Sequence, residues 1–203
     1  PEVIKEFASA DLGLGCGAPT KDADIKEGMT VLDLGSGAGI DVFIASKYVG
    51  STGKVIGLDM TQAMINRARD NASTLGIPNV EFHLGEIEQM PISANSVDRV
   101  ISNCVLNLVP DKSKAFAEIY RVLKPGGAFI VSDIVAKGNI PDDVRNNPEL
   151  WAGCIAGATN MTEYLNIITR AGFREMTIIK EKPYSKLSGD TYTLLSITVK
   201  GVK

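Results

Sequence analysis

Hydrophobic and polar positions follow two alternating patterns from residue 30 onward. Short, mostly apolar runs that are typical of buried strands lie at 31–34, 54–59, 80–84, 97–102 and 128–135. Most of these runs are separated by stretches in which apolar residues recur every three or four positions, which is the spacing of one helix face. Strands that alternate with helices predict an α/β fold with a mostly parallel sheet.

Capping residues and glycines mark where the predicted helices begin and end. The segment 61–75 places small and apolar residues on one face, with Thr61 as a candidate N-cap and Gly76 as its stop. Asn160, followed three residues later by Glu163, indicates the start of another helix. Helices are also predicted for residues 40–49, 114–123 and 149–158.

The end of the chain departs from the parallel pattern. Two strand-like runs, 174–181 and 192–200, are joined by a segment too short to hold a crossover helix, so the last pair is predicted to be antiparallel. A chain of 203 residues with 44% hydrophobic content fits one domain with a sizeable core. We therefore expect a single domain over residues 1–203, in which residues 1–28 form an N-terminal segment ahead of the first strand.

Charge and composition exclude several classes of partner. The 21 Lys and Arg are scattered among 24 Asp and Glu, with a net charge of -3, so the chain has no basic stripe for nucleic acid. No apolar run approaches the length of a membrane span, and the first twenty residues hold no signal-peptide core. We expect a cytoplasmic protein that acts on a small molecule, with no nucleic-acid or membrane partner and a monomer as the default state.

A glycine-rich turn follows the first predicted strand. The run VLDLGSGAG (31–39) is typical of a strand, a tight turn and a helix start, which together expose backbone N–H groups to a closely bound ligand. Its spacing is GxGxG, whereas dinucleotide-binding folds use GxGxxG. Asp59 ends the next strand twenty residues after Gly39, where a carboxylate suits a ribose diol. The alternative is a purely structural turn with Asp59 as a helix cap, but the coincidence of these features favours a nucleoside cofactor.

Three motifs together resemble a known family. VLDLGSGAG, the acid in VIGLDM and the later RVLKPGG are similar to motifs of the class I S-adenosylmethionine-dependent methyltransferases. The resemblance implies a Rossmann-like three-layer sandwich with a seven-stranded sheet in the order 3-2-1-4-5-7-6 and strand 7 antiparallel. It also implies S-adenosylmethionine as the cofactor.

The same resemblance assigns a role to each part of the cofactor site. Asp33 would lie near the amino group of the methionine moiety, and the glycine-rich turn would pass along that moiety. Asp59 would bind the ribose, and residues after the second and third strands would contact the adenine. The implied cofactor contacts are Asp33, Gly35, Ser36, Gly37, Gly39, Asp59, Met60, Glu86, Ile87 and Asn103.

The three cysteines bear on what accepts the methyl group. Cys16 lies in LGLGCGAP before the first predicted strand, Cys104 follows the fourth strand, and Cys154 lies in WAGCIAGA after the fifth. In an open α/β sheet the ligand crevice lies outside the carboxyl ends of the strands where the strand order reverses, which is here between strands 1 and 4. Cys104 is therefore expected beside the methyl donor, with Cys154 folding over the same crevice and Cys16 arriving from the N-terminal side.

Other interpretations of the cysteines remain open at this point. Free cysteine is among the most buried residue types and packs as a small hydrophobe. A structural zinc site needs a fourth ligand, and the only histidine, His83, alternates with apolar neighbours on a strand and is a poor candidate. The small and loop-forming residues that flank each cysteine favour a binding role. We expect free thiols, because disulfides are rare in a reducing compartment.

Trivalent arsenic fits three thiolates without a fourth ligand, because its lone pair takes the remaining tetrahedral position. That lone pair is itself a nucleophile, so thiolates that aim it at an electrophilic methyl group would act mainly by proximity and alignment. No general base is then needed, which suits a chain with one histidine. For an oxygen or nitrogen substrate, a carboxylate such as Asp133 is the alternative proton acceptor.

A second resemblance supports this chemistry. The run GEIEQMPISANSVDRVISNCVLNLVPDK, together with LGCGAP and WAGCIAGA, is similar to the As(III) S-adenosylmethionine methyltransferases over residues 11–173. The family's arsenic-binding thiols fall on Cys16, Cys104 and Cys154. The resemblance implies arsenite delivered as a thiol conjugate, a thiol reductant such as glutathione or thioredoxin, and a role in detoxification. Family members commonly carry a further upstream cysteine and a C-terminal domain, which have no counterpart in this sequence.

We therefore expect an arsenite methyltransferase, against three other classes of function. A class I methyltransferase for a small organic acceptor, such as a quinone precursor, would use the cysteines only for packing. A thiol sensor or metalloid sink would bind As(III) without turnover, and the intact cofactor motif argues against it. A nicotinamide dehydrogenase is disfavoured by the glycine spacing.

Overall fold

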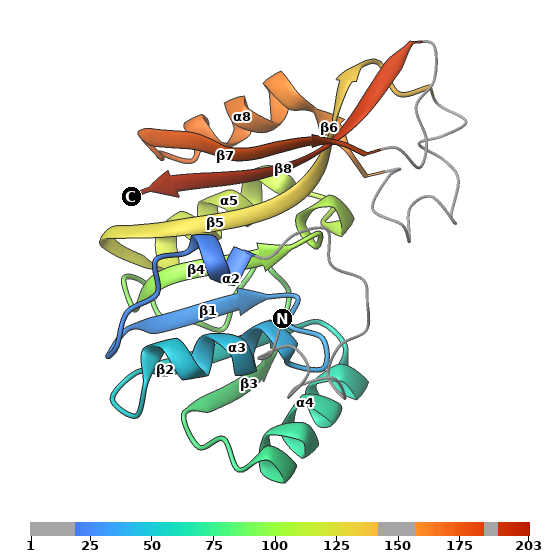
Figure 1. Ribbon diagram of the computed structural model, residues 1–203. Coiled ribbons are helices and arrows are strands. Elements are labelled where there is room, and N and C mark those ends of the chain that lie inside the picture. The colour runs from blue at the N-terminus through green and yellow to red at the C-terminus, as the bar shows by residue number, and fades with distance from the viewer. Residues whose placement is uncertain (1–18, 142–156, 185–190) are drawn as a thin grey trace.

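The computed structural model describes residues 19–141, 157–184 and 191–203. Within them one mixed sheet runs through the molecule, with helices packed on both of its faces (Figure 1). The strand order is β3-β2-β1-β4-β5-β8-β7, and a two-residue strand, β6 (Thr159–Asn160), pairs with β5 beside this path. This three-layer α/β sandwich is the fold class that the sequence predicts.

Parallel strands build the first part of the sheet, as their continuous apolar sequences predict. β1 pairs with β2 on one side and with β4 on the other, and β5 follows β4. β8 then runs antiparallel to both β5 and β7. The short strand β6 raises the numbers of the last two strands by one, so β8 is the expected seventh strand and β7 the expected sixth. The predicted strand order and the antiparallel last strand are therefore confirmed. The strands are β1 (Thr30–Leu34), β2 (Lys54–Asp59), β3 (Val80–Leu84), β4 (Val97–Asn103), β5 (Leu123–Gly138), β7 (Glu175–Pro183) and β8 (Tyr192–Val202).

The helices divide between the two faces of the sheet. Those before β4 pack on one face and those after it pack on the other. None of the helices in the described ranges is long and apolar enough to cross a membrane. Of the helix predicted for 149–158, only Gly157 and Ala158 are described, and neither is helical. The helices are α2 (Pro19–Asp22), α3 (Ile40–Val49) and α4 (Gln62–Leu75) on the first face, and α5 (Lys112–Val122) and α8 (Met161–Arg170) on the second.

The helix ends agree with the capping signals, with one difference. Gly76 ends α4 in the left-handed conformation, with φ 63°, and Asn160 Oδ1 accepts a hydrogen bond from Thr162 N at 3.0 Å at the start of α8. Thr61 occupies the N-cap position of α4, but its side chain makes no cap hydrogen bond. The contact at this end is made by Asp59, whose Oδ1 accepts from Thr61 N at 2.9 Å.

Four aromatic rings pack between β5 and the helices of the second face. Phe116 meets Phe129 and Tyr164 edge-on, with ring centroids 5.6 Å apart in both pairs. Phe129 also meets Phe173, at 4.7 Å. All four rings are buried. Edge-to-face pairs stabilise beyond the area that they bury, so this cluster fixes α8 against β5.

One acid is buried beside these rings. Asp133, on β5, is fully buried, and Tyr164 Oη donates a hydrogen bond to its Oδ2 at 2.7 Å. Burial raises the pKa of Asp133 to about 7, while the Tyr164 hydrogen bond, the charge of Lys112 and the backbone N–H of Asn107 act in the opposite direction. The carboxyl group considered above as an alternative proton acceptor is therefore enclosed between β5 and α8.

We predict that Asp133 makes the protein less stable as the pH rises from about 4 to about 7. An aspartate in the unfolded chain loses its proton near pH 4, whereas the buried Asp133 holds it up to about pH 7. Between these values the folded state binds more protons, so the free energy of unfolding falls with rising pH, by at most about 1.4 kcal/mol per pH unit for this one group. Asp133→Asn should remove that slope when urea unfolding is measured across this range.

Asp70→Asn, on the exposed side of α4, is the matched control and should keep the pH profile of the wild type. The comparison between the two variants isolates burial, because each substitution removes one carboxylate. Parallel profiles for Asp133→Asn and the wild type would contradict a raised pKa at Asp133.

Candidate functional site

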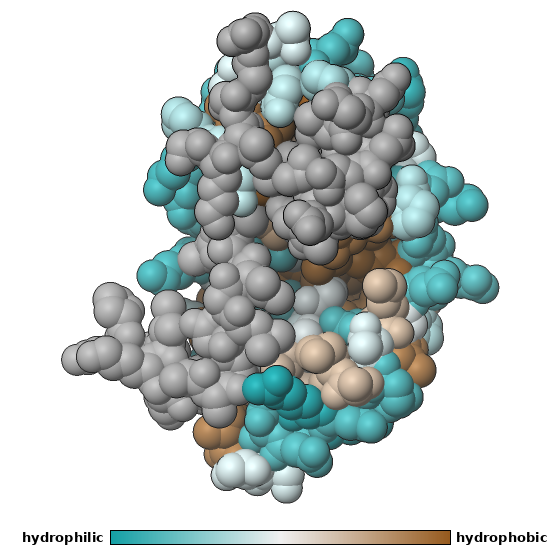
Figure 2. All heavy atoms as spheres, turned by 90° about the vertical axis from the view of Figure 1, so that its right-hand side faces the viewer, coloured by the Kyte–Doolittle hydropathy of each residue, from teal (hydrophilic) through white to brown (hydrophobic). Residues whose placement is uncertain are grey.

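The carboxyl ends of the central strands form the edge that carries the predicted site. β1 and β4 lie side by side here, and the sheet continues through β2 in one direction and through β5 in the other. These ends point to the right in Figure 1, and Figure 2 views the molecule from that side. Hydrophobic surface is visible near the centre of that face, with hydrophilic surface to its right and below it (Figure 2). A reversal of strand order is where ligands bind in open α/β sheets.

The turn after β1 is built from glycines with left-handed backbones. Gly35, Gly37 and Gly39 have φ values of 67°, 51° and 98°, conformations that residues with side chains rarely adopt. Space is a second constraint at Gly35, where an added Cβ would lie 2.2 Å from Val105 Cγ2. The Gly35 N–H anchors the turn by donating to Leu58 O on β2 at 2.8 Å. The turn therefore brings bare backbone to the edge, as the sequence predicts.

Asp59 accepts hydrogen bonds from three segments: the glycine turn, the start of α4 and the turn after β3. Its Oδ2 accepts from Gly37 N at 3.0 Å, and its Oδ1 accepts from Thr61 N at 2.9 Å. Its backbone oxygen accepts from Gly85 N, after β3, at 3.0 Å. An ionised carboxylate has about four lone-pair sites, so both oxygens keep acceptor capacity. The predicted ribose contact is held by the surrounding backbone and can still accept from a diol.

Three carboxylates gather around the glycine turn. Asp33 is 3% exposed, and its burial, followed by the charges of Asp41 and Asp59, raises its pKa well above the ordinary range. Asp41 Oδ1 accepts a hydrogen bond from Thr20 Oγ1 at 2.7 Å. A positively charged ligand group would relieve the repulsion that raises the pKa of Asp33. The turn therefore fits a ligand that carries an ammonium group.

Two buried hydroxyls at the same edge have no hydrogen-bond partner among the described residues. They are Ser36 Oγ, in the glycine turn, and Ser102 Oγ, near the end of β4. Buried polar atoms are normally hydrogen-bonded. Both hydroxyls therefore keep unused hydrogen-bonding capacity near the carboxyl ends of β1 and β4.

The remaining predicted cofactor contacts lie at the ends of β2, β3 and β4. Met60 directly follows β2 and is 75% exposed. Glu86 and Ile87 follow β3, and Ile87 is buried. The last residues of β2 and β3 are paired in register, so these segments leave the sheet side by side. Asn103 is the last residue of β4. The structure thus brings the predicted contacts to one edge.

Cys104 has an unusual backbone conformation directly after β4. Its φ of 62° is left-handed, which is uncommon for a residue with a side chain. Its N–H donates to Ser132 O on β5 at 2.7 Å. Its side chain is 3% exposed and packs in an apolar cluster that includes Ile134 and Leu194. Cys104 therefore lies at the carboxyl end of β4, as predicted.

Cys104 is disulfide-bonded in this structure. This corrects the expectation that all thiols are free. The physical reason is proximity, because cysteines that a fold brings within bonding geometry can pair. Cys16 and Cys154 lie outside the described residues, so a three-cysteine cluster stays a prediction.

Described residues that follow the other two cysteines reach the same edge. Gly157 comes three residues after Cys154, and a Cβ added to it would lie 1.9 Å from a backbone oxygen of the turn that follows Cys104. Thr20 comes four residues after Cys16, and its hydroxyl donates a hydrogen bond to Asp41 at the start of α3. The chain after each of these cysteines therefore approaches the glycine turn or the Cys104 turn.

Sequence reasoning missed two features of this site. A left-handed cysteine has no sequence signal, because glycine and asparagine are the residues that commonly adopt this conformation. The acid cluster was missed because Asp41 stands in the first turn of α3, where acidic residues are ordinary. The short spacing from Asp33 to Asp41 across a tight turn was the available signal.

Among the described residues, no group of three or more His, Cys, Asp or Glu is placed to hold a metal ion. His83, which the sequence disfavours as a ligand, lies with its Nε2 3.1 Å from Glu81 Oε1 on the same strand. That strand, β3, is an outermost strand of the sheet, with a neighbour on one side only. The histidine is therefore a partly solvated residue on the outermost strand.

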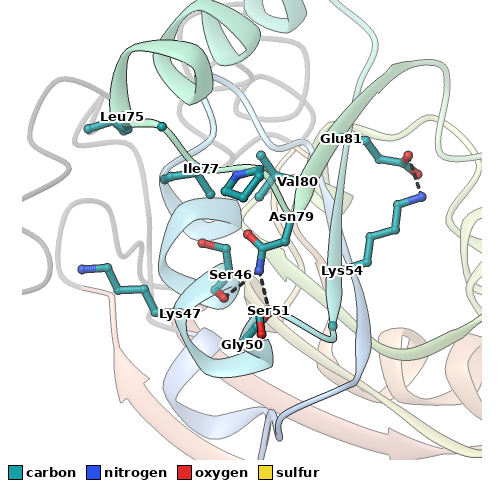
Figure 3. A pocket seen from close by; sticks show the side chains of 13 residues that line it. Ser46, Lys47, Gly50, Ser51, Lys54, Leu75, Ile77, Asn79, Val80 and Glu81 are labelled. Carbon is teal, nitrogen blue, oxygen red and sulfur yellow. Dashed lines mark hydrogen bonds and ion pairs between the residues drawn. The ribbon is translucent and has the colours of Figure 1, made fainter.

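A groove of about 770 Å³ lies at the opposite, amino-terminal ends of the strands (Figure 3). Its lining comes from the ends of α3 and α4 and the starts of β2 and β3. Asn79 Nδ2 donates to Ser46 O at 3.1 Å and to Gly50 O at 2.8 Å. Lys54 Nζ lies 2.6 Å from Glu81 Oε2. These polar groups already stabilise the fold, and the groove is not the predicted site.

Comparisons with known proteins agree with this geometry. A sequence model of a methyltransferase domain family matches residues 25–172. The crystal structure of an arsenic(III) S-adenosylmethionine methyltransferase from Chlamydomonas reinhardtii superposes with a TM-score of 0.86 at 34% identity, covering 100% of this chain and 74% of that one.

Two curated proteins are similar in sequence. The arsenite methyltransferase of Halobacterium salinarum is 47% identical over 189 residues, which is 93% of this chain and 48% of that protein. The ubiquinone/menaquinone biosynthesis C-methyltransferase of Escherichia coli is 39% identical over 108 residues, or 53% of this chain and 43% of that protein. The chain thus spans about half the length of the curated relatives it matches. It belongs to the methyltransferase domain family and, within it, to the As(III) S-adenosylmethionine methyltransferases.

Proposed function

We propose that this chain transfers a methyl group from S-adenosylmethionine to As(III) held by Cys16, Cys104 and Cys154. The observation that carries the proposal is the Cys104 turn, which lies against the glycine turn where the strand order reverses, with Val105 next to Gly35. Similarity to arsenite methyltransferases supports the same acceptor. The proposal includes a cytoplasmic monomer that acts in detoxification.

The residues of the glycine turn would hold S-adenosylmethionine, which supplies an electrophilic methyl group on a sulfonium. Asp33, among neighbouring acids, would face the positively charged amino group. Asp59 would accept from the ribose hydroxyls with the acceptor capacity that its backbone partners leave. Met60 and Ile87 would offer apolar surface to the adenine.

On the acceptor side, the thiolates of this chain would act by binding and orientation. They would displace the thiols of a carrier such as glutathione, keep water from the arsenic and aim its lone pair at the methyl group. Because the lone pair is the nucleophile, no proton has to be removed from the acceptor. Cys104 is disulfide-bonded here, so binding requires prior reduction. Glutathione or thioredoxin would supply the two electrons and two protons by thiol–disulfide exchange.

A second candidate function is methylation of a small organic acceptor such as a quinone precursor. The 39% identity to the Escherichia coli C-methyltransferase favours it, over about half of this chain. Removing a proton from such an acceptor calls for a base at the site. Asp133 is fully buried and bonded to Tyr164, so it does not offer one at the edge. The two functions differ in whether the cysteines are required.

Cys104→Ser should abolish arsenite methylation while cofactor affinity stays within about twofold of the wild type. Serine has nearly the volume of cysteine but is a far weaker ligand for arsenic. The assay combines the reduced full chain with labelled S-adenosylmethionine, a thiol and arsenite, and detects methylated arsenic by chromatography and mass spectrometry. Calorimetry measures cofactor affinity in the same samples.

Ser51→Ala is the control for this substitution. Ser51 lies in the groove at the amino-terminal ends of the strands, and its loss should keep wild-type turnover. Wild-type turnover by Cys104→Ser would remove the proposed ligand role and favour an organic acceptor.

Asp59→Ala should weaken cofactor binding by roughly 10- to 100-fold, the effect of losing one or two hydrogen bonds to a charged group. The carboxylate also holds Gly37 and Thr61, so the glycine turn loses its anchor as well. Calorimetric titration with S-adenosylmethionine measures the change. Asp70→Ala, exposed on α4, is the matched control. Equal affinities for Asp59→Ala and the control would reject the ribose assignment.

A further inference from the structure

Cys104 adopts a backbone conformation that only surrounding contacts maintain. A left-handed residue with a side chain persists where the structure around it fixes it. Its own N–H gives one anchor, to Ser132 O on β5 at 2.7 Å. The chain then continues into a short 3-10 helix, η2 (Leu106–Leu108). The groups that hold η2 therefore determine whether the cysteine keeps its position.

Asn107, the central residue of η2, gives a second anchor to the same strand. It is fully buried, and its Nδ2 donates to Ile134 O at 2.8 Å. Ile134 comes two residues after Ser132, which accepts from Cys104. The turn is thus bonded to β5 at two points that bracket the buried Asp133.

Lys112, in the first turn of α5, holds the carbonyl side of the same turn. Its Nζ donates to Asn107 O at 3.4 Å and to Val109 O at 3.3 Å. Burial lowers the pKa of Lys112, while the charges of Asp133 and Glu88 act in the opposite direction. The lysine therefore joins η2 to α5, and its charge interacts with that of the buried acid.

Asp133 lies between three elements. The Asn107 N–H of η2 and the Lys112 charge of α5 both favour its carboxylate form. Tyr164, on α8, donates to its Oδ2 at 2.7 Å. A buried acid near a partly buried lysine is costly unless both groups are paired and hydrogen-bonded. Here Lys112 bonds two carbonyl groups in and after η2, and Asp133 Oδ2 bonds Tyr164, while Asp133 Oδ1 has no hydrogen-bond partner among the described residues.

We propose that four side chains form one positioning network that keeps Cys104 in its left-handed turn against the glycine turn. The network consists of Asn107, Lys112, Asp133 and Tyr164. These residues act on the reaction only through the cysteine, so they are positioning residues. The inference rests on the proposed function for the role of Cys104 as an arsenic ligand, but the position of the thiol can be measured without arsenic.

The test compares lysine variants on α5. Lys112→Met removes the charge and both hydrogen bonds and keeps most of the side-chain stem, while Lys112→Arg keeps a charged donor. Lys114→Met is the matched control, because Lys114 is 71% exposed and lies two residues further along the helix. Tyr164→Phe probes the network from α8 by removing one hydroxyl, and it serves where Lys112→Met does not fold.

The first readout is the alkylation rate of Cys104 in the reduced, arsenic-free chain, followed by iodoacetamide labelling and peptide mapping. Released from its turn, the thiol should react at least about tenfold faster in Lys112→Met, and faster in Tyr164→Phe. Lys114→Met should match the wild type, and Lys112→Arg should return toward it. Urea unfolding of each variant separates local release from global instability.

The second readout is arsenite methylation. Lys112→Met should lower kcat at least about tenfold, with KM for S-adenosylmethionine within about twofold, because the cofactor contacts are intact. Equal alkylation of Cys104 in Lys112→Met, Tyr164→Phe and Lys114→Met overturns the network, whatever the acceptor. Faster alkylation in a protein that does not methylate arsenite keeps the network and rejects the proposed function.

Discussion

The contact between Gly35 and Val105 is the constraint on which the rest of the edge depends. A Cβ at Gly35 would lie 2.2 Å from the Val105 side chain, so the loops after β1 and β4 meet only because that position has no side chain. Cys104 directly precedes Val105 and turns the chain in a left-handed conformation at this contact. The sheet, which pairs β1 with β4, therefore sets the separation between the glycine turn and Cys104. Sites held by regular elements are more precisely placed than sites on free loops.

Burial is the largest cause of a raised pKa at two acids on this sheet, Asp33 and Asp133, but their neighbours act on it in opposite directions. Asp33 lies near an open edge, and after burial the largest causes are two other acids, Asp41 and Asp59. Asp133 lies in the closed core, where Tyr164 and Lys112 oppose the effect of burial. A carboxylate destabilised by like charges is ready to receive a cation, whereas Asp133 already accepts a hydrogen bond from Tyr164 and is stabilised by the charge of Lys112. The first environment suits a ligand site and the second suits a structural anchor.

Local patterns predicted most of the fold. The apolar runs predicted the positions of the strands. The glycine turn could be predicted from backbone conformation alone, because Gly35, Gly37 and Gly39 have the left-handed conformations that glycine permits. The strand order was implied by family resemblance and could not be derived from periodicity alone. The expected position of the cofactor site followed from that order, since residues at the carboxyl ends of neighbouring strands meet there.

Contacts between distant segments were what the sequence could not reveal. Lys112 follows a proline and an aspartate in VPDK, a pattern typical of a solvated helix start, yet its ammonium group bonds the carbonyls of η2. Asp133 stands in an apolar strand, and its partner Tyr164 is 31 residues away. The disulfide state of Cys104 likewise depends on tertiary proximity. Tertiary contacts of this kind override local propensity, so they appear only when the fold is known.

The oxidised state of Cys104 and the proposed arsenic site place the same demand on the fold. A disulfide forms only where two cysteine side chains approach within bonding geometry. One arsenic atom shared between thiolates requires a similar approach. Oxidation and arsenic binding would therefore compete for the same sulfur atoms, and a thiol reductant would decide which prevails. The approach of a second cysteine to Cys104 supports the proposed function, because a cysteine used only for packing needs no partner sulfur.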